Sequence, residues 1–233
     1  MAILRQPQHP TPNPDLATTL STYLQSQHLP PAQAWLQTLL PTLKPTTPLL
    51  AQQKTALFRL LATDLKTSVQ PSPSTTFSPA ISDPSIKDQR IPGPIAVQVL
   101  DVEDIGRSRW SQVEALEAAE RGETTKGREV VRVVPEEGNA ENATTASAGP
   151  HKLLLQDAKG TNVYGIEVVG VEGVGVGMSI GAKLVLRDVT VARGVVLLEP
   201  RCAEVIGGKV DAWDRKWRAE RKKVLQEKAG MQR

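Results

Sequence analysis

Cysteine and histidine are scarce in this chain of 233 residues, which has one cysteine and three histidines. Cys202 has no partner for an internal disulfide, and His9, His28 and His151 lie too far apart for the ligand spacing of a zinc or iron site. The sequence therefore predicts no metal, no cofactor and no metal-dependent chemistry.

Long apolar runs are also missing. No segment reaches the roughly 18 consecutive apolar residues that mark a membrane span, and the N-terminal sequence MAILRQPQHP has too short an apolar run for a signal peptide. These absences predict a soluble intracellular protein with no membrane partner. The hydrophobic share of 39% is low, yet it suffices for the cores of one large domain or two small ones.

Catalytic motifs are absent as well. His151 precedes an apolar strand, and no G-x-S-x-G elbow supplies a nucleophile for it. The glycine-rich stretch GVEGVGVGMSIGAK (170–183) has neither the spacing of a dinucleotide fingerprint nor the Lys-Ser/Thr ending of a P-loop. We interpret it as a turn between strands with Lys183 exposed, Cys202 as a small buried residue, and the protein as not an enzyme.

Aromatic residues make up 3% of the chain, and its charge is unevenly distributed. Residues 207–233 have five more basic than acidic side chains, whereas residues 93–149 have five more acidic than basic ones. An acidic middle and a basic tail do not fit a protein that clamps nucleic acid along its whole length. The tail is either a solvated charged face or a source of weak DNA phosphate contacts, for which the candidates are Arg215, Lys216, Arg218 and Lys222.

The first third of the chain has the apolar spacing of helices. Leucine-rich patterns recur within residues 13–29, 30–41 and 48–66, and the first pattern begins with Asn13 as a cap and Pro14 at the first helical position. We predict a three-helix bundle over residues 1–67. Six prolines in residues 68–94 then indicate a linker over 68–93, or an extended arm packed on a neighbouring part.

From residue 94 the pattern changes to that of short strands with no helical crossovers. We expect strands within PIAVQVLDV, HKLLLQDAKG, TNVYGIEVVGV, AKLVLRDVTVAR, GVVLLEP and CAEVIGG, with a hairpin at DAKG and a final helix up to residue 228. This predicts an α+β fold in which the bundle is followed by an OB-fold barrel over 94–228. A long insertion, 103–149, separates its first two strands; it contains the amphipathic unit SRWSQVEALEAAE and ends in a low-complexity stretch, 136–149, that we expect to be mobile.

Five stretches together resemble the RecQ-mediated genome instability protein 1 family, in particular its short fungal-type members. They are LFRLLATDLKTSV, IPGPIAVQVLDVEDI, SRWSQVEALE, LLLQDAKGTNVYGIEV and RGVVLLEPRCAEVIGGKVDAW. The resemblance implies a nuclear, non-catalytic subunit that binds a type IA topoisomerase III and a RecQ-type DNA helicase. It further implies a role in decatenation and in dissolution of double Holliday junctions during DNA repair.

The resemblance also implies where partners bind. The insertion would be the loop that reaches the topoisomerase gate, with contacts from Arg107, Arg109, Trp110, Val113 and Leu116. A partner-facing end of the barrel would include Glu199, Arg201, Gly207, Gly208 and Asp211. Two other interpretations remain open: an OB-fold module that binds single-stranded DNA independently of a topoisomerase, and a scaffold that holds the helicase through residues 1–66.

Overall fold

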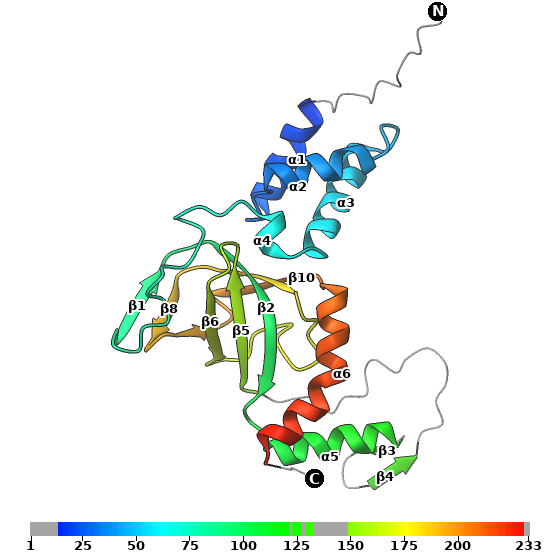
Figure 1. The fold of residues 1–233 in the computed structure, drawn as a ribbon, viewed down its shortest axis with the longest axis vertical. Helices are drawn as coiled ribbons and strands as arrows, with labels where there is room; N and C mark the ends of the chain where they lie inside the picture. Colours follow the sequence, from blue (N-terminus) through cyan, green and yellow to red (C-terminus); the bar gives the residue numbers. More distant parts are fainter. Residues whose placement is uncertain (1–13, 122, 127–128, 133–148, 231–233) are drawn as a thin grey trace, which may run out of the picture.

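The computed structural model describes residues 14–121, 123–126, 129–132 and 149–230. Figure 1 shows a group of N-terminal helices above a strongly curled sheet, with a C-terminal helix along one side of that sheet. An inserted helix crosses the far end of the C-terminal helix, and a small hairpin lies at the other end of this inserted helix (Figure 1). The predicted order, with a helical part before a β-rich part, is the one observed.

The N-terminal helices pack around a leucine core. They are α1 (Pro14–Ser26), α2 (Gln33–Leu39) with a short 3-10 turn (Leu40–Thr42), α3 (Leu49–Leu61) and α4 (Leu65–Ser68). Leu20, Leu24 and Leu60 are fully buried between them. Burying each such side chain stabilises the fold by about 1.5–3 kcal/mol relative to leaving it exposed. The leucines whose spacing predicted the helices are therefore the ones that form the core.

The helix expected over 48–66 is in fact two helices. Asp64 lies between them, and its carboxylate accepts the N–H of Lys66 at 3.0 Å, which caps the start of α4. Pro14 begins α1 as predicted, while Asn13 lies outside the described residues.

The Pro/Ser-rich segment after α4 is an extended arm packed on the sheet. Phe77 and Ile81 are buried in the sheet's own core, and the Phe77 N–H donates to the Asp157 carboxylate at 2.8 Å. The arm ends in strand β1 (Asp88–Ile91), which pairs with β8 in antiparallel fashion. Of the two interpretations of residues 68–93, the structure shows the arm.

The sheet has eight strands in the order β1-β8-β9-β6-β5-β2-β7-β10, so β1 and β10 are its edges among the described residues. The other bounds are β2 (Ile95–Asp104), β5 (His151–Asp157), β6 (Asn162–Glu167), β7 (Lys183–Leu186), β8 (Val189–Ala192), β9 (Val195–Leu198) and β10 (Ala203–Gly207). Strand β2 pairs with both β5 and β7, with a register shift at Leu100 that helps the sheet to curl. The β6–β9 pair is parallel, and every other pair in this sheet is antiparallel.

The predicted hairpin at DAKG joins β5 to β6. Asp157 holds it closed, because its side chain accepts the N–H groups of Lys159 at 3.0 Å and Thr161 at 2.7 Å. The C-terminal helix is α6 (Asp211–Lys228), and the insertion contains α5 (Arg109–Glu120) and a hairpin of β3 (Glu123–Lys126) and β4 (Glu129–Arg132). The sequence patterns predicted α5 and α6 but not this hairpin.

The helices sit on the outer face of β2 and β7, and Lys183 lies at the centre of that contact. Its ammonium donates to the carbonyl oxygens of Leu61 at 3.0 Å, Thr63 at 2.7 Å and Gly181 at 2.7 Å. The prediction of an exposed Lys183 is therefore wrong: the side chain is fully buried. Carbonyls at the end of α3 have no partner within the helix, and a cation there satisfies them.

Gln98 on the neighbouring strand completes this contact. Its carbonyl accepts the N–H of Leu65 at 2.8 Å, and its amide donates to Asp64 at 2.7 Å and Gln156 at 3.0 Å. Burial disfavours the charged form of Lys183 and lowers its pKa to about 8. The negative charge of Asp64 raises this pKa, but by less than burial lowers it. The helices and the sheet are thus joined by a satisfied buried polar network.

Candidate protein interface at the inserted helix

The insertion leaves and re-enters the sheet at a single narrow neck. Paired β2 and β5 run to Asp104 and His151, and just beyond them the Ile105 N–H donates to the Pro150 carbonyl at 3.0 Å. A Cβ on Gly106 would lie 2.1 Å from the carbonyl oxygen of Gly149, so this close approach requires a glycine. The two ends of the inserted segment are therefore in direct contact.

Helix α5 follows the neck immediately and is fixed at its first turn. The Ser108 hydroxyl accepts the N–H of Ser111 at 3.1 Å, which is an N-terminal cap. The buried amide of Gln112 donates to the carbonyl of Asp104 at 2.9 Å and to that of Arg107 at 3.1 Å. These bonds hold the start of α5 against the end of β2.

The five residues expected to contact a topoisomerase gate all lie on or next to α5, but they differ in exposure. Trp110 is 57% exposed, and its indole N–H donates to Glu114 at 2.9 Å, whereas Val113 is 3% exposed. Leu116 and Arg107 are half-buried, and Arg109 is exposed while bonded to Glu103 at 3.1 Å. The structure thus presents Trp110 and Arg109 to solvent and places Val113 in the packing beneath α5.

Glu103 is a buried carboxylate that ties three elements together. It forms ion pairs with Lys152 at 2.8 Å, with Arg109 at 3.1 Å and with Lys228 at 3.7 Å. Burial alone would raise the pKa of Glu103, but the hydrogen bond and charge of Lys152, with smaller contributions from Lys228 and Arg109, lower it below its ordinary value. Sequence reasoning placed Glu103 at the start of the insertion and missed this role.

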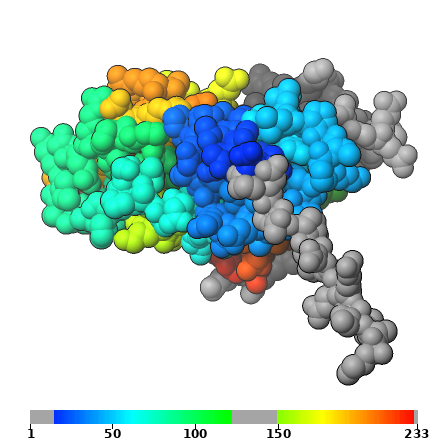
Figure 2. Space-filling model, turned by 90° about the horizontal axis from the view of Figure 1, so that it is seen from above, coloured from blue at the N-terminus to red at the C-terminus, as the bar shows by residue number. Residues whose placement is uncertain are grey.

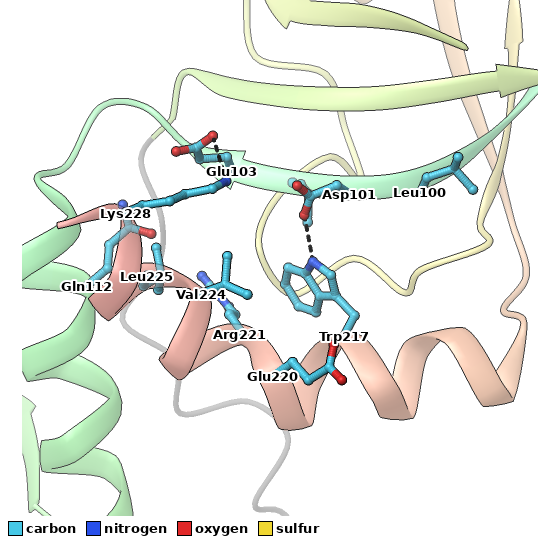
Figure 3. Close-up of a pocket in the computed structure, with 11 residues that line it drawn as sticks. Leu100, Asp101, Glu103, Gln112, Trp217, Glu220, Arg221, Val224, Leu225 and Lys228 are labelled. Carbon is cyan, nitrogen blue, oxygen red and sulfur yellow. Dashed lines mark hydrogen bonds and ion pairs between the residues drawn. The ribbon is translucent and has the colours of Figure 1, made fainter. Parts of the chain in front are cut away.

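Figure 3 shows a hollow of about 290 Å³ where α6 passes over β2 and the start of α5. Trp217 closes one side, and its indole N–H donates to Asp101 at 2.7 Å. Arg221 lies over the Trp217 ring at 4.9 Å from its centroid, and burial lowers the pKa of this guanidinium. These contacts make α6 a fixed support for α5.

The four basic residues predicted to touch DNA all lie on α6, and two of them already have acidic partners. Arg218 pairs with the buried Asp214 at 2.9 Å, and Lys222 pairs with Glu120 of α5 at 2.7 Å. Arg215 and Lys216 are exposed on the solvent side of the helix. The described contacts of Arg218 and Lys222 therefore join α6 to itself and to α5.

The residues predicted to form a partner-facing barrel end are not brought together. Glu199 and Arg201 form an ion pair at 2.5 Å in the turn before β10, whereas Gly207 and Gly208 lie at the other end of that strand. A five-residue strand separates the two groups by roughly 16 Å at about 3.3 Å per residue. Asp211 begins α6 and pairs with Lys209 at 3.0 Å, while Gly208 lies against Leu61 of α3.

The rim of the sheet beside the neck carries an apolar patch that the sequence patterns did not single out. It consists of Ile105, Pro150, Val168 and Val169, all of which are exposed. The β2–β5 and β5–β6 pairings bring Ile105, Pro150 and the residues after β6 to one rim of the sheet, and the Val168 N–H donates to the Leu198 carbonyl at 2.9 Å, one residue before Glu199. We call this surface the neck patch; its clue in the sequence is the run Val168-Val169 just after β6.

Buried ionisable and thiol groups elsewhere have structural partners. His151 is buried and bonded to Glu167, whose other oxygen accepts the Val171 N–H at 3.0 Å, so this pair fixes the start of the glycine-rich turn. Cys202 is buried, and its sulfur accepts the Glu199 N–H at 3.3 Å. Within the described ranges, no cluster of three or more His, Cys, Asp or Glu side chains could hold a metal, and no helix could cross a membrane.

Comparison with known proteins finds a helical domain and an OB-fold domain in this chain. The family domain described as "RMI1, N-terminal OB-fold domain" matches residues 65–221, and "RMI1, N-terminal helical domain" matches residues 24–68. The chain is 30% identical over 223 residues to "RecQ-mediated genome instability protein 1" of Schizosaccharomyces pombe, covering 85% of this chain and 90% of that protein. The prediction of an OB-fold behind a helical domain is confirmed.

Proposed function

Because the chain belongs to the RecQ-mediated genome instability protein 1 family, we propose that it is a non-catalytic subunit that acts with a RecQ-type DNA helicase and a type IA topoisomerase III. In this role it promotes decatenation and the dissolution of double Holliday junctions, and it acts in the nucleus. The 136–148 part of the insertion, which we expected to be mobile, lies outside the described residues.

The neck and α5 are the observation that carries this proposal. A topoisomerase gate opens and closes, and a partner shifts that equilibrium only by binding one state more tightly than the other. A helix held at a single neck, supported by α6 and presenting Trp110, has a fixed start and a side chain suited to an interface. These features support a role in gate opening better than a role in chemistry.

The neck patch supplies a second surface for the same partner. Exposed apolar side chains that cluster on a soluble domain mark interaction sites. Ile105, Val168 and Val169 form such a cluster directly beside the point where the insertion departs. We assign topoisomerase docking to this rim and gate contact to α5.

The contact at the neck makes the two roles separable by excision. Removing residues 107–148 and joining Gly106 to Gly149 through two glycines requires no movement of the sheet, because the ends already touch. We expect the excised protein to retain topoisomerase binding in a pull-down and to lose most of its stimulation of decatenation of catenated DNA circles.

Trp110→Ala is the matched point variant, because replacing an exposed side chain should change the free energy of unfolding by no more than about 0.5 kcal/mol. Trp110→Ala should still bind the topoisomerase but should stimulate decatenation less than the wild type does. Undiminished decatenation by both variants would contradict the assignment of α5 to the gate.

One observation favours the alternative of an OB-fold that binds single-stranded DNA. Tyr164 is exposed on β6 with Lys152 at 5.3 Å from its ring centroid, an arrangement on which a base can stack. Titration with a fluorescent oligonucleotide at two salt concentrations tests it. Tight, steeply salt-dependent binding that Tyr164→Ala abolishes would favour this alternative.

A further inference from the structure

Helix α3 has an apolar face that points away from both the bundle core and the sheet. Gln52, Ala56 and Leu60 form its buried side, while Phe58 is 72% and Leu50 62% exposed on the opposite side. Figure 2 shows α3, in light blue, at the surface of the molecule. Leu50, Lys54 and Phe58 follow each other at intervals of four residues and therefore form one stripe.

The stripe borders a hollow between α2 and α3. This hollow has a volume of about 260 Å³ and is lined by Trp35, Thr38, Leu39, Arg59, Ala62 and Thr63. Ala62 follows Phe58 by one helical turn, so the hollow lies beside the stripe. An apolar ridge next to a partly aromatic hollow is a shape that receives a helix with large apolar side chains at every third or fourth position.

The charges around this surface have one sign. Lys54 and Arg59 are exposed there, and α3 has no carboxylate. Arg59 donates to the Thr42 hydroxyl at 2.6 Å, which holds its guanidinium at the edge of the hollow. A guanidinium fixed in this way is suited to a carboxylate on a partner. The carboxylate of Asp64, in contrast, is engaged at the contact with the sheet.

We propose that the outer face of α3 docks an acidic amphipathic helix of the RecQ-type helicase. This inference rests on the proposed function for the identity of the helicase and on the structure for the chemistry of the surface. Phe58 and Leu50 bury against the apolar side of that helix, a Leu or Phe side chain enters the α2–α3 hollow, and its carboxylates pair with Lys54 and Arg59. Topoisomerase docking at the neck patch uses the opposite end of β2 and is independent of it.

The test compares four versions of the full chain for capture of the purified cognate helicase and, separately, of the topoisomerase. Leu50→Ala/Phe58→Ala and Lys54→Glu should each weaken helicase binding about tenfold or more, as for the loss of an interface anchor, with topoisomerase binding unchanged. Val224→Ala removes a less exposed apolar side chain from α6, outside the α3 face, and should behave as the wild type. Overlapping peptides of the helicase then locate the segment, which should be acidic and helical.

Equal helicase binding by all four versions would overturn the docking site and leave the proposed function standing. The excised protein that lacks residues 107–148 serves as a further comparison: helicase binding that is lost only in this protein would overturn the docking site in the same way. Failure of the wild type to bind either enzyme would overturn both. If the α3 substitutions weaken binding of an oligonucleotide instead of the helicase, the face is a nucleic-acid surface and the proposal is wrong.

Discussion

Lys183 is the residue on which the contact between helices and sheet most depends. Its ammonium donates hydrogen bonds to three carbonyl oxygens, two of which lie at or just after the end of α3. Lys183→Met keeps the apolar stem but leaves these buried acceptors without a donor, which should cost about 2–3 kcal/mol of unfolding free energy. Urea unfolding measures this, and Lys216→Met, at an exposed site on α6, should change it little.

The pH dependence of the stability difference between the wild type and Lys183→Met tests whether Lys183 has this lowered pKa. Burial lowers the pKa of Lys183 from its ordinary 10.5 to about 8, so between these values the unfolded chain binds more protons than the folded one. Stability of the wild type relative to Lys183→Met should therefore rise as the pH increases through this window. A constant difference from pH 7 to pH 10.5 would show that Lys183 titrates normally in the folded protein.

At the scale of elements, the turn from β10 to α6 allows a controlled test of the contact with α3. Gly207 and Gly208 both have positive φ, but a Cβ on Gly208 would lie 2.6 Å from the Leu61 carbonyl, whereas one on Gly207 would meet nothing within 4 Å. Gly207→Ala should therefore cost about 1–2 kcal/mol, the penalty of the left-handed conformation alone. Gly208→Ala should cost clearly more in thermal unfolding; equal losses would mean that α3 moves aside freely.

For the whole molecule, local patterns in the sequence predicted most of the helices and strands, though not β1 or the β3–β4 hairpin, because apolar residues recur on the face of an element that is buried. They could not predict Lys183 and Gln98, whose partners on α3 and α4 lie far away in the chain: Lys183 is 122 residues from Leu61. From the local pattern alone, a polar residue in a strand is expected to face solvent. In β2 and β7 the helices cover the outer face as well, so these polar residues are buried. The local pattern correctly placed Trp110 on a helix. The neck patch could not be found in this way, because it forms only when strands from before and after the insertion pair.

The same long-range contacts predict that the helices and the sheet unfold together. The core of the helical part includes Ala96 and Ala158 from the sheet, and the arm that follows α4 places Phe77 and Ile81 in the core of the sheet. Neither part buries its apolar surface alone, so we expect one calorimetric transition whose van't Hoff and calorimetric enthalpies agree. A protein of residues 14–68 should consequently show little stable helix by circular dichroism. Two separate transitions in the full chain would instead indicate independent domains and would make the helical part a docking module in its own right.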